Sequence, residues 1–265
     1  MAFNFFASKR VFRDRADAVE VCDERGVRRL FVAGRAIQSA MRIDAPFELE
    51  LEYTRAMMAA LLFQGLPREA LLIGLGGGSL AKFLYQQVPG CHITAIEISA
   101  QVIAVARGLF FLPEGNSRLR VIEADGAEYL GRNPANCDLL LVDAYQGSSP
   151  PEVLTRSEFF ANCKRALSPD GIAVINFWST DKSFTRYRAR VDSAFNGLTL
   201  QLPTRKHANV IMFAFTRRPP QLAIGKLEAA AKLLETQMGI EFGKLLADLK
   251  CANRVLAGEF QLGLA

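Results

Sequence analysis

Three acidic side chains stand at or just after the ends of apolar runs in this sequence. Glu97 ends one run, Asp125 follows the next, and Asp143 comes directly after residues 139–142. A carboxylate can accept hydrogen bonds from ribose hydroxyls or from an adenine amino group, and it can take a proton from an attacking amine. Because the carboxyl ends of parallel strands meet at one edge of a sheet, the sequence predicts that these acids converge on one small molecule.

A glycine-rich turn precedes Glu97 by about twenty residues, the spacing typical of nucleotide-binding folds. Gly74, Gly76, Gly77 and Gly78 follow an apolar run and precede a helical stretch. Glycine lets the backbone turn sharply and lie against a ligand, and an acid at this distance suits both hydroxyls of a ribose. The pattern predicts a nucleoside-binding site; the alternative is a tight strand-to-helix turn with an incidental surface glutamate.

Two of the acids have alternative roles. Asp125 precedes Gly126 at an expected strand-to-helix junction, where an aspartate also caps a helix N-terminus, and both roles can coexist. Asp143 either orients an amine and accepts its proton or caps the next loop. That loop, residues 144–156, is rich in Gly, Ser and Pro and is expected to act as a gate over a substrate.

The composition limits the possible classes of protein. Half of the 265 residues are hydrophobic, and the formal net charge is +5. No apolar run reaches the roughly twenty residues of a membrane helix, and the start lacks a signal-peptide pattern. Basic residues are interrupted by acids and lack interleaved aromatic residues, so a solvated face is favoured over a nucleic-acid site. Five cysteines without CxxC spacing and only two histidines predict a cytoplasmic protein with reduced thiols and no metal site.

The expected elements indicate an α/β fold in three parts. Residues 1–48 are expected to form a small N-terminal antiparallel β domain, residues 49–218 a Rossmann-like nucleoside-binding domain, and residues 219–265 a helical extension. Strands expected near 70–75, 92–97, 119–124, 138–143 and 171–177 alternate with helices, which is typical of a parallel sheet covered on both faces. Runs 198–202 and 210–216 should close this seven-stranded, mostly parallel sheet as an antiparallel hairpin.

The hairpin bears on which nucleoside is bound. The sheet of S-adenosylmethionine-dependent transferases ends with such a hairpin, whereas a six-stranded, all-parallel nicotinamide-binding domain has none. Ser79 also stands where the third glycine of a dinucleotide motif would fall. A nicotinamide-dependent dehydrogenase is therefore the weakest of the enzyme hypotheses.

The chain resembles the spermidine/spermine synthase family, the polyamine aminopropyltransferases, from about residue 19 to residue 219. The resemblance is carried by the segments 34–38, 74–78, 95–99, 125–127, 154–160 and 165–171, together with Asp143. It implies a homodimer or homotetramer built partly from the N-terminal sheet. It also implies that Gln38, Glu97 and Asp125 hold decarboxylated S-adenosylmethionine or a related nucleoside, with Asp143 as the catalytic carboxylate.

The residues expected to contact ligands fall into two sets. The nucleoside set comprises Gln38, Gly74, Gly76, Gly77, Gly78, Glu97, Ile98, Asp125 and Gly126. The substrate set comprises Tyr53, Tyr145, Gln146 and Trp178, although core packing explains Trp178 equally well.

The chain departs from the family on the substrate side. Gly77 stands where the family has an Asp that holds the aminopropyl amino group, Gln146 replaces a second acid, and Arg55 stands in place of a glutamate. A charge-assisted hydrogen bond contributes roughly 1.5–3 kcal/mol, so losing two of them would weaken the binding of a diamine by orders of magnitude.

Aminopropyl transfer to a small-molecule amine is the leading hypothesis. Methyl transfer from S-adenosylmethionine is the alternative, because Gly77 no longer supplies the acid suited to the decarboxylated cofactor. A non-catalytic homologue that senses a nucleoside or serves as a scaffold is the hypothesis from another class, and it is motivated by the altered acids.

Overall fold

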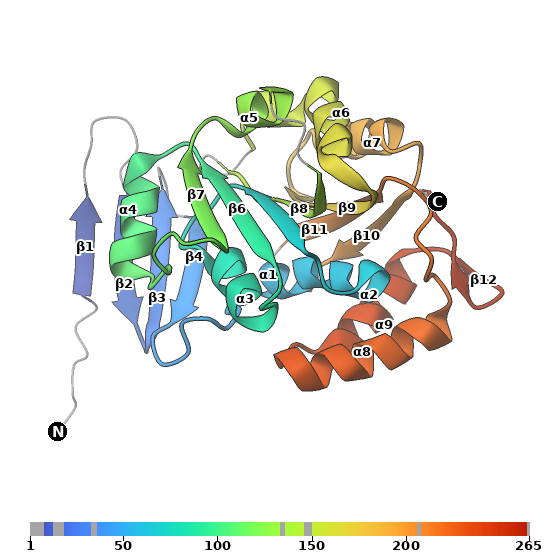
Figure 1. Ribbon diagram of the computed structural model, residues 1–265, viewed down its shortest axis with the longest axis horizontal. Coiled ribbons are helices and arrows are strands. Elements are labelled where there is room, and N and C mark those ends of the chain that lie inside the picture. The colour runs from blue at the N-terminus through green and yellow to red at the C-terminus, as the bar shows by residue number, and fades with distance from the viewer. Residues whose placement is uncertain are drawn as a thin grey trace.

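The computed structural model describes residues 8–12, 19–32, 36–132, 136–145, 150–205 and 208–263, with the backbone alone for 8–12. A small antiparallel sheet, a central mixed sheet covered by helices, and a C-terminal helical segment follow one another along the chain (Figure 1).

The central sheet has seven strands in the spatial order β10-β11-β9-β8-β5-β6-β7. Strand β11 runs antiparallel to both of its neighbours, and the other pairs are parallel, so the expected closing hairpin is present. The strands are β5 (Glu69–Ile73), β6 (His92–Glu97), β7 (Leu119–Glu123), β8 (Cys137–Val142), β9 (Leu167–Trp178), β10 (Thr199–Pro203) and β11 (Asn209–Phe215).

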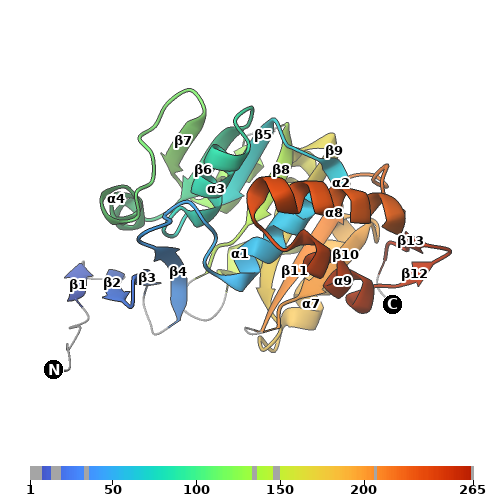
Figure 2. The same cartoon turned by 90° about the horizontal axis from the view of Figure 1, so that it is seen from below.

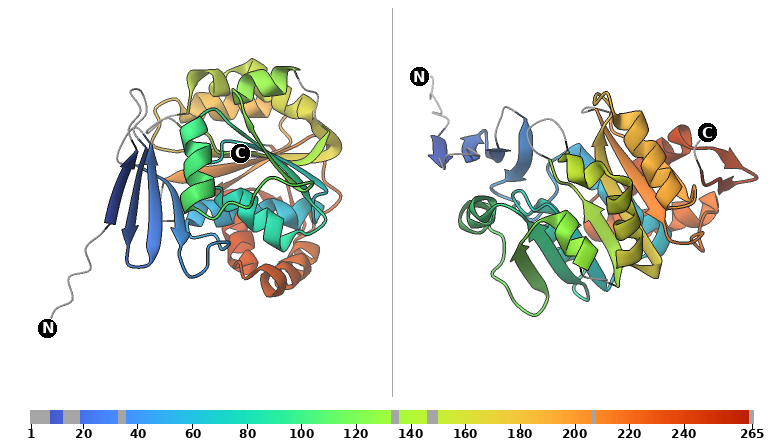
Figure 3. Two further views of the ribbon diagram at one scale, coloured as in Figure 1. Left: turned by 60° about the vertical axis from the view of Figure 1, so that its left-hand side comes forward. Right: turned by 90° about the horizontal axis from the view of Figure 1, so that it is seen from above.

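Helices cover both faces of this sheet, which explains why its inner strands read as continuous apolar runs. Figure 3 shows α5, α6 and α7 on one face, and α1, α2, α3, α8 and α9 on the other. Alternate residues of the inner strands join two separate hydrophobic clusters, one on each side. The covering helices are α1 (Glu52–Met57), α2 (Leu61–Gln64), α3 (Ser79–Gln87), α5 (Gly126–Arg132), α6 (Ser157–Ala166), α7 (Phe184–Ala194), α8 (Ile224–Met238) and α9 (Phe242–Ala252).

The N-terminal sheet packs against α4 (Ala100–Leu109) beside the main sheet. Its strands are β1 (Ser8–Phe12), β2 (Val19–Glu24), β3 (Val27–Val32) and β4 (Ile37–Arg42), in spatial order. Inward-facing side chains such as Val19, Val21 and Leu30 meet Val102 and Val105 of α4 in a third hydrophobic cluster. Strand β1 lies within the expected N-terminal β domain but was not itself expected as a strand.

Other elements also differ from expectation. The apolar residues of 50–63 recur at helical spacing, but the segment is not one continuous helix: a 3₁₀ turn, η1 (Met58–Ala60), separates α1 from α2. A second 3₁₀ turn, η2 (Glu152–Thr155), lies in the expected gate loop. The C-terminal segment divides at Gly239, whose φ of 68° ends α8 as a left-handed cap, and the segment closes with a short hairpin (Figure 2). The strands of this hairpin are β12 (Val255–Leu256) and β13 (Glu259–Phe260). Within the described ranges, no helix is both long and apolar enough to cross a bilayer.

A buried lysine on α3 connects this helix to the N-terminal sheet and to the end of α4. The Nζ atom of Lys82 on α3 donates to the Phe110 carbonyl at 2.6 Å and contacts the Met41 sulfur of β4 at 3.1 Å. The carbonyl lies at the C-terminal end of α4, where a cation is favoured by the helix dipole. Burial nevertheless lowers the pKa of Lys82 from 10.5 to about 7.

This burial predicts a pH-dependent stability. Between pH 7 and 10.5 the unfolded chain binds a proton at Lys82 that the folded chain does not, so the free energy of unfolding rises with pH across that window. The variant Lys82→Met lacks this slope. Urea unfolding of both proteins at about pH 6.5 and 9.5 measures the difference.

The control is Lys232→Met on the exposed face of α8, which should show the same difference from wild type at both pH values. A pH-independent effect of Lys82→Met would contradict the assignment.

Candidate functional site

The strand order reverses between β5 and β8, and the chain turns sharply there. Gly74 follows β5 and Asp143 follows β8. A Cβ atom built on Gly74 would lie 2.3 Å from the Asp143 carbonyl oxygen, and the φ of Gly74 is +93°. Only glycine adopts this φ without strain and has no Cβ atom to clash with the Asp143 carbonyl. The close approach of the two strand ends therefore requires glycine at position 74.

A cavity of about 350 Å³ opens at this edge of the sheet. It brings together most of the side chains expected to contact ligands. Of the expected set, Gln38, Tyr53, Gly74, Gly76, Glu97, Ile98, Asp125, Gly126, Asp143 and Tyr145 line it. Ser79, at the end of the expected glycine-rich turn, also lines it, and the polar lining residues Ser39, Thr54 and Ser99 were not expected.

Backbone amides hold the carboxylate of Glu97 in place. Its Oε2 accepts from the amide of Leu75 at 2.9 Å, and its Oε1 accepts from the amide of Ser99 at 3.0 Å. Each carboxylate oxygen has a second lone pair. The acid is thus pre-oriented on the wall of the cavity and retains acceptor capacity for two hydroxyl groups.

Asp125 caps a helix and also faces the cavity. Its Oδ1 accepts from the amides of Ala127 and Glu128 at 2.8 and 3.0 Å, at the start of α5. Both hydrogen bonds fall on one oxygen, and Oδ2 remains for a donor such as an amino group. Apolar side chains also line the cavity, including Ile98, which is 60% exposed, and Val153. These groups suit a flat, apolar ring with an amino group on its edge.

Two neutral donors hold Asp143. Its Oδ2 accepts from the Tyr53 hydroxyl at 3.0 Å, and its Oδ1 accepts from the Asn176 amide at 2.8 Å. Burial raises the pKa of Asp143, while the two hydrogen bonds oppose that shift. Burial and the adjacent carboxylate raise the pKa of Tyr53 well above its ordinary value, so its hydroxyl stays protonated. The carboxylate is a better proton acceptor than an exposed aspartate.

Asn176 is the main residue that the sequence analysis missed. The parallel register of β8 and β9 pairs Val142 with Ile175, so Asp143 and Asn176 follow side by side. Asn176 is 4% exposed, and it stands in an otherwise apolar run from Ile172 to Phe177. A lone amide in a buried strand was the available signal, since buried polar groups are hydrogen-bonded.

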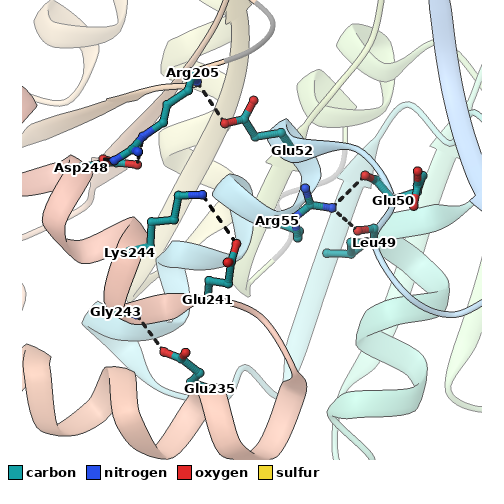
Figure 4. Close-up of polar contacts among 10 residues, drawn as sticks. All are labelled: Leu49, Glu50, Glu52, Arg55, Arg205, Glu235, Glu241, Gly243, Lys244 and Asp248. Atoms are coloured by element: carbon teal, nitrogen blue, oxygen red, sulfur yellow. Dashed lines mark hydrogen bonds and ion pairs between the residues drawn. The ribbon is translucent and has the colours of Figure 1, made fainter.

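Four residues expected to contact ligands are not among the described residues that line the cavity. Trp178 stacks on Tyr145, with ring centroids 5.3 Å apart, and does not itself line the cavity. Gly77 and Gly78 also lie outside the lining, and Gln146 is outside the described residues. Arg55, which stands where the family pattern has a glutamate, does not line the cavity either. It donates to the carbonyls of Leu49 and Glu50 (Figure 4).

Comparison with known proteins places this cavity in a family. The profile described as the spermine/spermidine synthase domain matches residues 50–217. The chain belongs to the spermine/spermidine synthase family. It is 42% identical over 236 residues to a polyamine aminopropyltransferase of Neisseria meningitidis, covering 89% of this chain and 90% of the relative. The expected family and its transferase class are confirmed.

Solved structures share the fold. A spermidine synthase in complex with the transition state analogue AdoDATO has a TM-score of 0.71 and 16% identity, covering 91% of this chain and 84% of that one. Human methyltransferase-like protein 13 in complex with SAH has a TM-score of 0.61 and 26% identity, covering 71% and 93%. The expected Rossmann-like transferase fold is confirmed.

Gly77, where the sequence departs from the family pattern, lies against closely packed side chains. A Cβ built there would lie 2.6 Å from a ring carbon of Phe110 and 2.8 Å from the Ser39 hydroxyl oxygen. Phe110 is fully buried, and its carbonyl is held by Lys82. An acid cannot be restored at position 77 without displacing this ring.

Substitutions at Gly77 are therefore expected to destabilise the fold. We expect Gly77→Ala to lower the free energy of unfolding by about 1–3 kcal/mol and Gly77→Asp to lower it further. Gly108→Ala in α4, where a Cβ meets nothing within 4 Å, should instead raise it by up to about 1 kcal/mol. Urea unfolding measures all three, and equal effects of the two alanine variants would contradict this packing.

Proposed function

We propose that this chain transfers an aminopropyl group from decarboxylated S-adenosylmethionine to a small-molecule amine. The proposal is carried by the Asp143 carboxylate, which lines the cavity with Glu97 and Asp125 and is held by neutral donors. The polyamine aminopropyltransferases related to the chain support it. Glu97 would take the ribose hydroxyls, and Asp125 the adenine amino group.

The reaction is a direct displacement at the carbon next to the sulfonium. The amine nitrogen forms a bond to that carbon while the carbon–sulfur bond breaks. The electron pair of the broken bond stays on sulfur, which becomes a neutral thioether. Asp143 accepts the proton that the nitrogen loses. Most of the rate enhancement comes from holding nitrogen and carbon in line.

The proposal extends to organisation and location. The match over 50–217 supports a catalytic domain at 49–218 between the N-terminal sheet, 1–48, and the extension, 219–265. We also propose that the protein assembles as a homodimer or homotetramer. The five unpaired cysteines favour a cytoplasmic location.

Methyl transfer is the second candidate. It is favoured by Gly77, which supplies no acid, and by the structural similarity to a methyltransferase-like protein in complex with SAH. Calorimetry and product analysis with each cofactor and a diamine distinguish the two. We expect binding of decarboxylated S-adenosylmethionine and release of 5′-methylthioadenosine. Release of S-adenosylhomocysteine from S-adenosylmethionine would favour methyl transfer, and no binding or turnover with either cofactor would favour the non-catalytic alternative.

The raised pKa of Asp143 predicts opposite effects on activity and stability. Asp143→Asn should lower kcat by about 10²- to 10⁴-fold through loss of the proton acceptor. Because the folded pKa is raised, the ionised carboxylate is less favourable in the folded than in the unfolded chain above that pKa. The variant should therefore have a higher melting temperature than wild type at pH 7.

The same shift should be visible in the wild-type pH profile. The acidic limb of kcat/KM is expected at a higher pH than an ordinary aspartate would give, and stopped assays from about pH 4 to 9 would locate it. Retained turnover in Asp143→Asn would remove the proposed role of this carboxylate.

A further inference from the structure

Both hydrogen-bond donors of Asp143 lead to the connection between β10 and β11. Tyr53 belongs to α1, and the neighbouring residue, Glu52, accepts at Oε1 from the backbone amide of Arg205 at 3.0 Å. Arg205 lies two residues beyond the end of β10. The position of α1, and with it the Tyr53 hydroxyl, is thus tied to this connection (Figure 4).

The second donor reaches the same connection through asparagines. Asn176 accepts at Oδ1 from the Asn209 side-chain amide at 2.9 Å. The carbonyl of Asn209 in turn accepts from the amide of Thr204 at 2.8 Å. Asn176 and Asn209 are 4% and 5% exposed, so the hydrogen bond between their side chains is shielded from water. Hydrogen bonds and the covalent links between adjacent residues thus form a closed path that begins and ends on the Asp143 carboxylate.

The C-terminal helix α9 holds the connection in place. The guanidinium of Arg205 pairs with the Asp248 carboxylate through two contacts, one of them Nε to Oδ2 at 3.1 Å (Figure 4). The Asp248 side chain is 19% exposed, and α9 lies beyond the matched range 50–217. Asn253, just after α9, exchanges two hydrogen bonds with the backbone of Gln201 in β10.

We propose that Arg205 and Asp248 are positioning residues, through which the C-terminal extension sets the hydrogen bonds on Asp143. The inference rests on the proposed function, in which Asp143 accepts the proton. Arg205 is 59% exposed, and ion pairs with an exposed member contribute little to stability. We therefore expect the loss of this pair to change the hydrogen-bond geometry of Asp143 more than the stability of the fold. Small displacements of a reacting group cost large factors in rate.

The variants Asp248→Asn and Arg205→Ala test this role. Each should lower kcat by about tenfold with little change in KM. Each should also move the acidic limb of kcat/KM to higher pH, because a carboxylate that loses hydrogen-bond donors has a higher pKa. The double variant should be no worse than Arg205→Ala alone, since both changes remove one interaction. Asp248→Glu keeps the negative charge and should retain most of the wild-type activity. That result would show that position 248 tolerates substitution.

A second ion pair of the same residue types provides the control. Arg217 pairs with Asp170 near the opposite end of β9, and its arginine is as exposed as Arg205, at 63% and 59%, although Asp170 is more exposed than Asp248, at 58% and 19%. Asp170→Asn should leave kcat and the pH profile unchanged. An unchanged profile in Asp248→Asn, with an active wild type, would overturn the positioning role alone. A wild type without aminopropyl transfer would overturn the proposed function and this inference with it.

Discussion

A carboxylate held at a strand end by neutral donors is the constraint on which the site depends. Asp143 must come out of a buried strand, remain partly withdrawn from water, and still be able to ionise. A cation beside it would lower its pKa and make it a poor base, whereas Tyr53 and Asn176 orient it without supplying charge. The reversal of strand order beside β5 supplies the position, and Gly74 supplies the clearance.

The rest of the cavity is assembled from parts that cannot form it separately. Strand β4 brings Gln38 and Ser39, helix α1 brings Tyr53, and the central sheet brings the acids. The N-terminal sheet is fixed to the sheet domain through α4 and through the buried Lys82. The same packing closes the space beside Gly77, so a larger side chain does not fit there without moving Phe110 or Ser39.

The central sheet was predictable because strands buried on both faces, such as β8, are apolar throughout. The acids at the strand ends were predictable for the same reason, since their positions follow from where the apolar runs stop. The contact of Asn176 with Asp143 depends on the register between β8 and β9, which local sequence does not encode. The close packing around Gly77 likewise depends on Ser39 and Phe110, which are distant in the chain. The hydrogen bonds of Arg55 to backbone carbonyls depend on the geometry of the loop before α1. The roles of these residues with ligand remain predictions.

The central claim is that acids at the ends of separate strands hold the adenosine part of an S-adenosyl-type nucleoside, with the sulfur of that nucleoside directed at Asp143. A crystal structure with 5′-methylthioadenosine tests it most directly. We expect the ribose hydroxyls on Glu97, the adenine amino group at Asp125, and the thioether sulfur facing the space between Tyr53 and Asp143. A nucleoside bound elsewhere, or one whose sulfur points away from Asp143, would contradict this account.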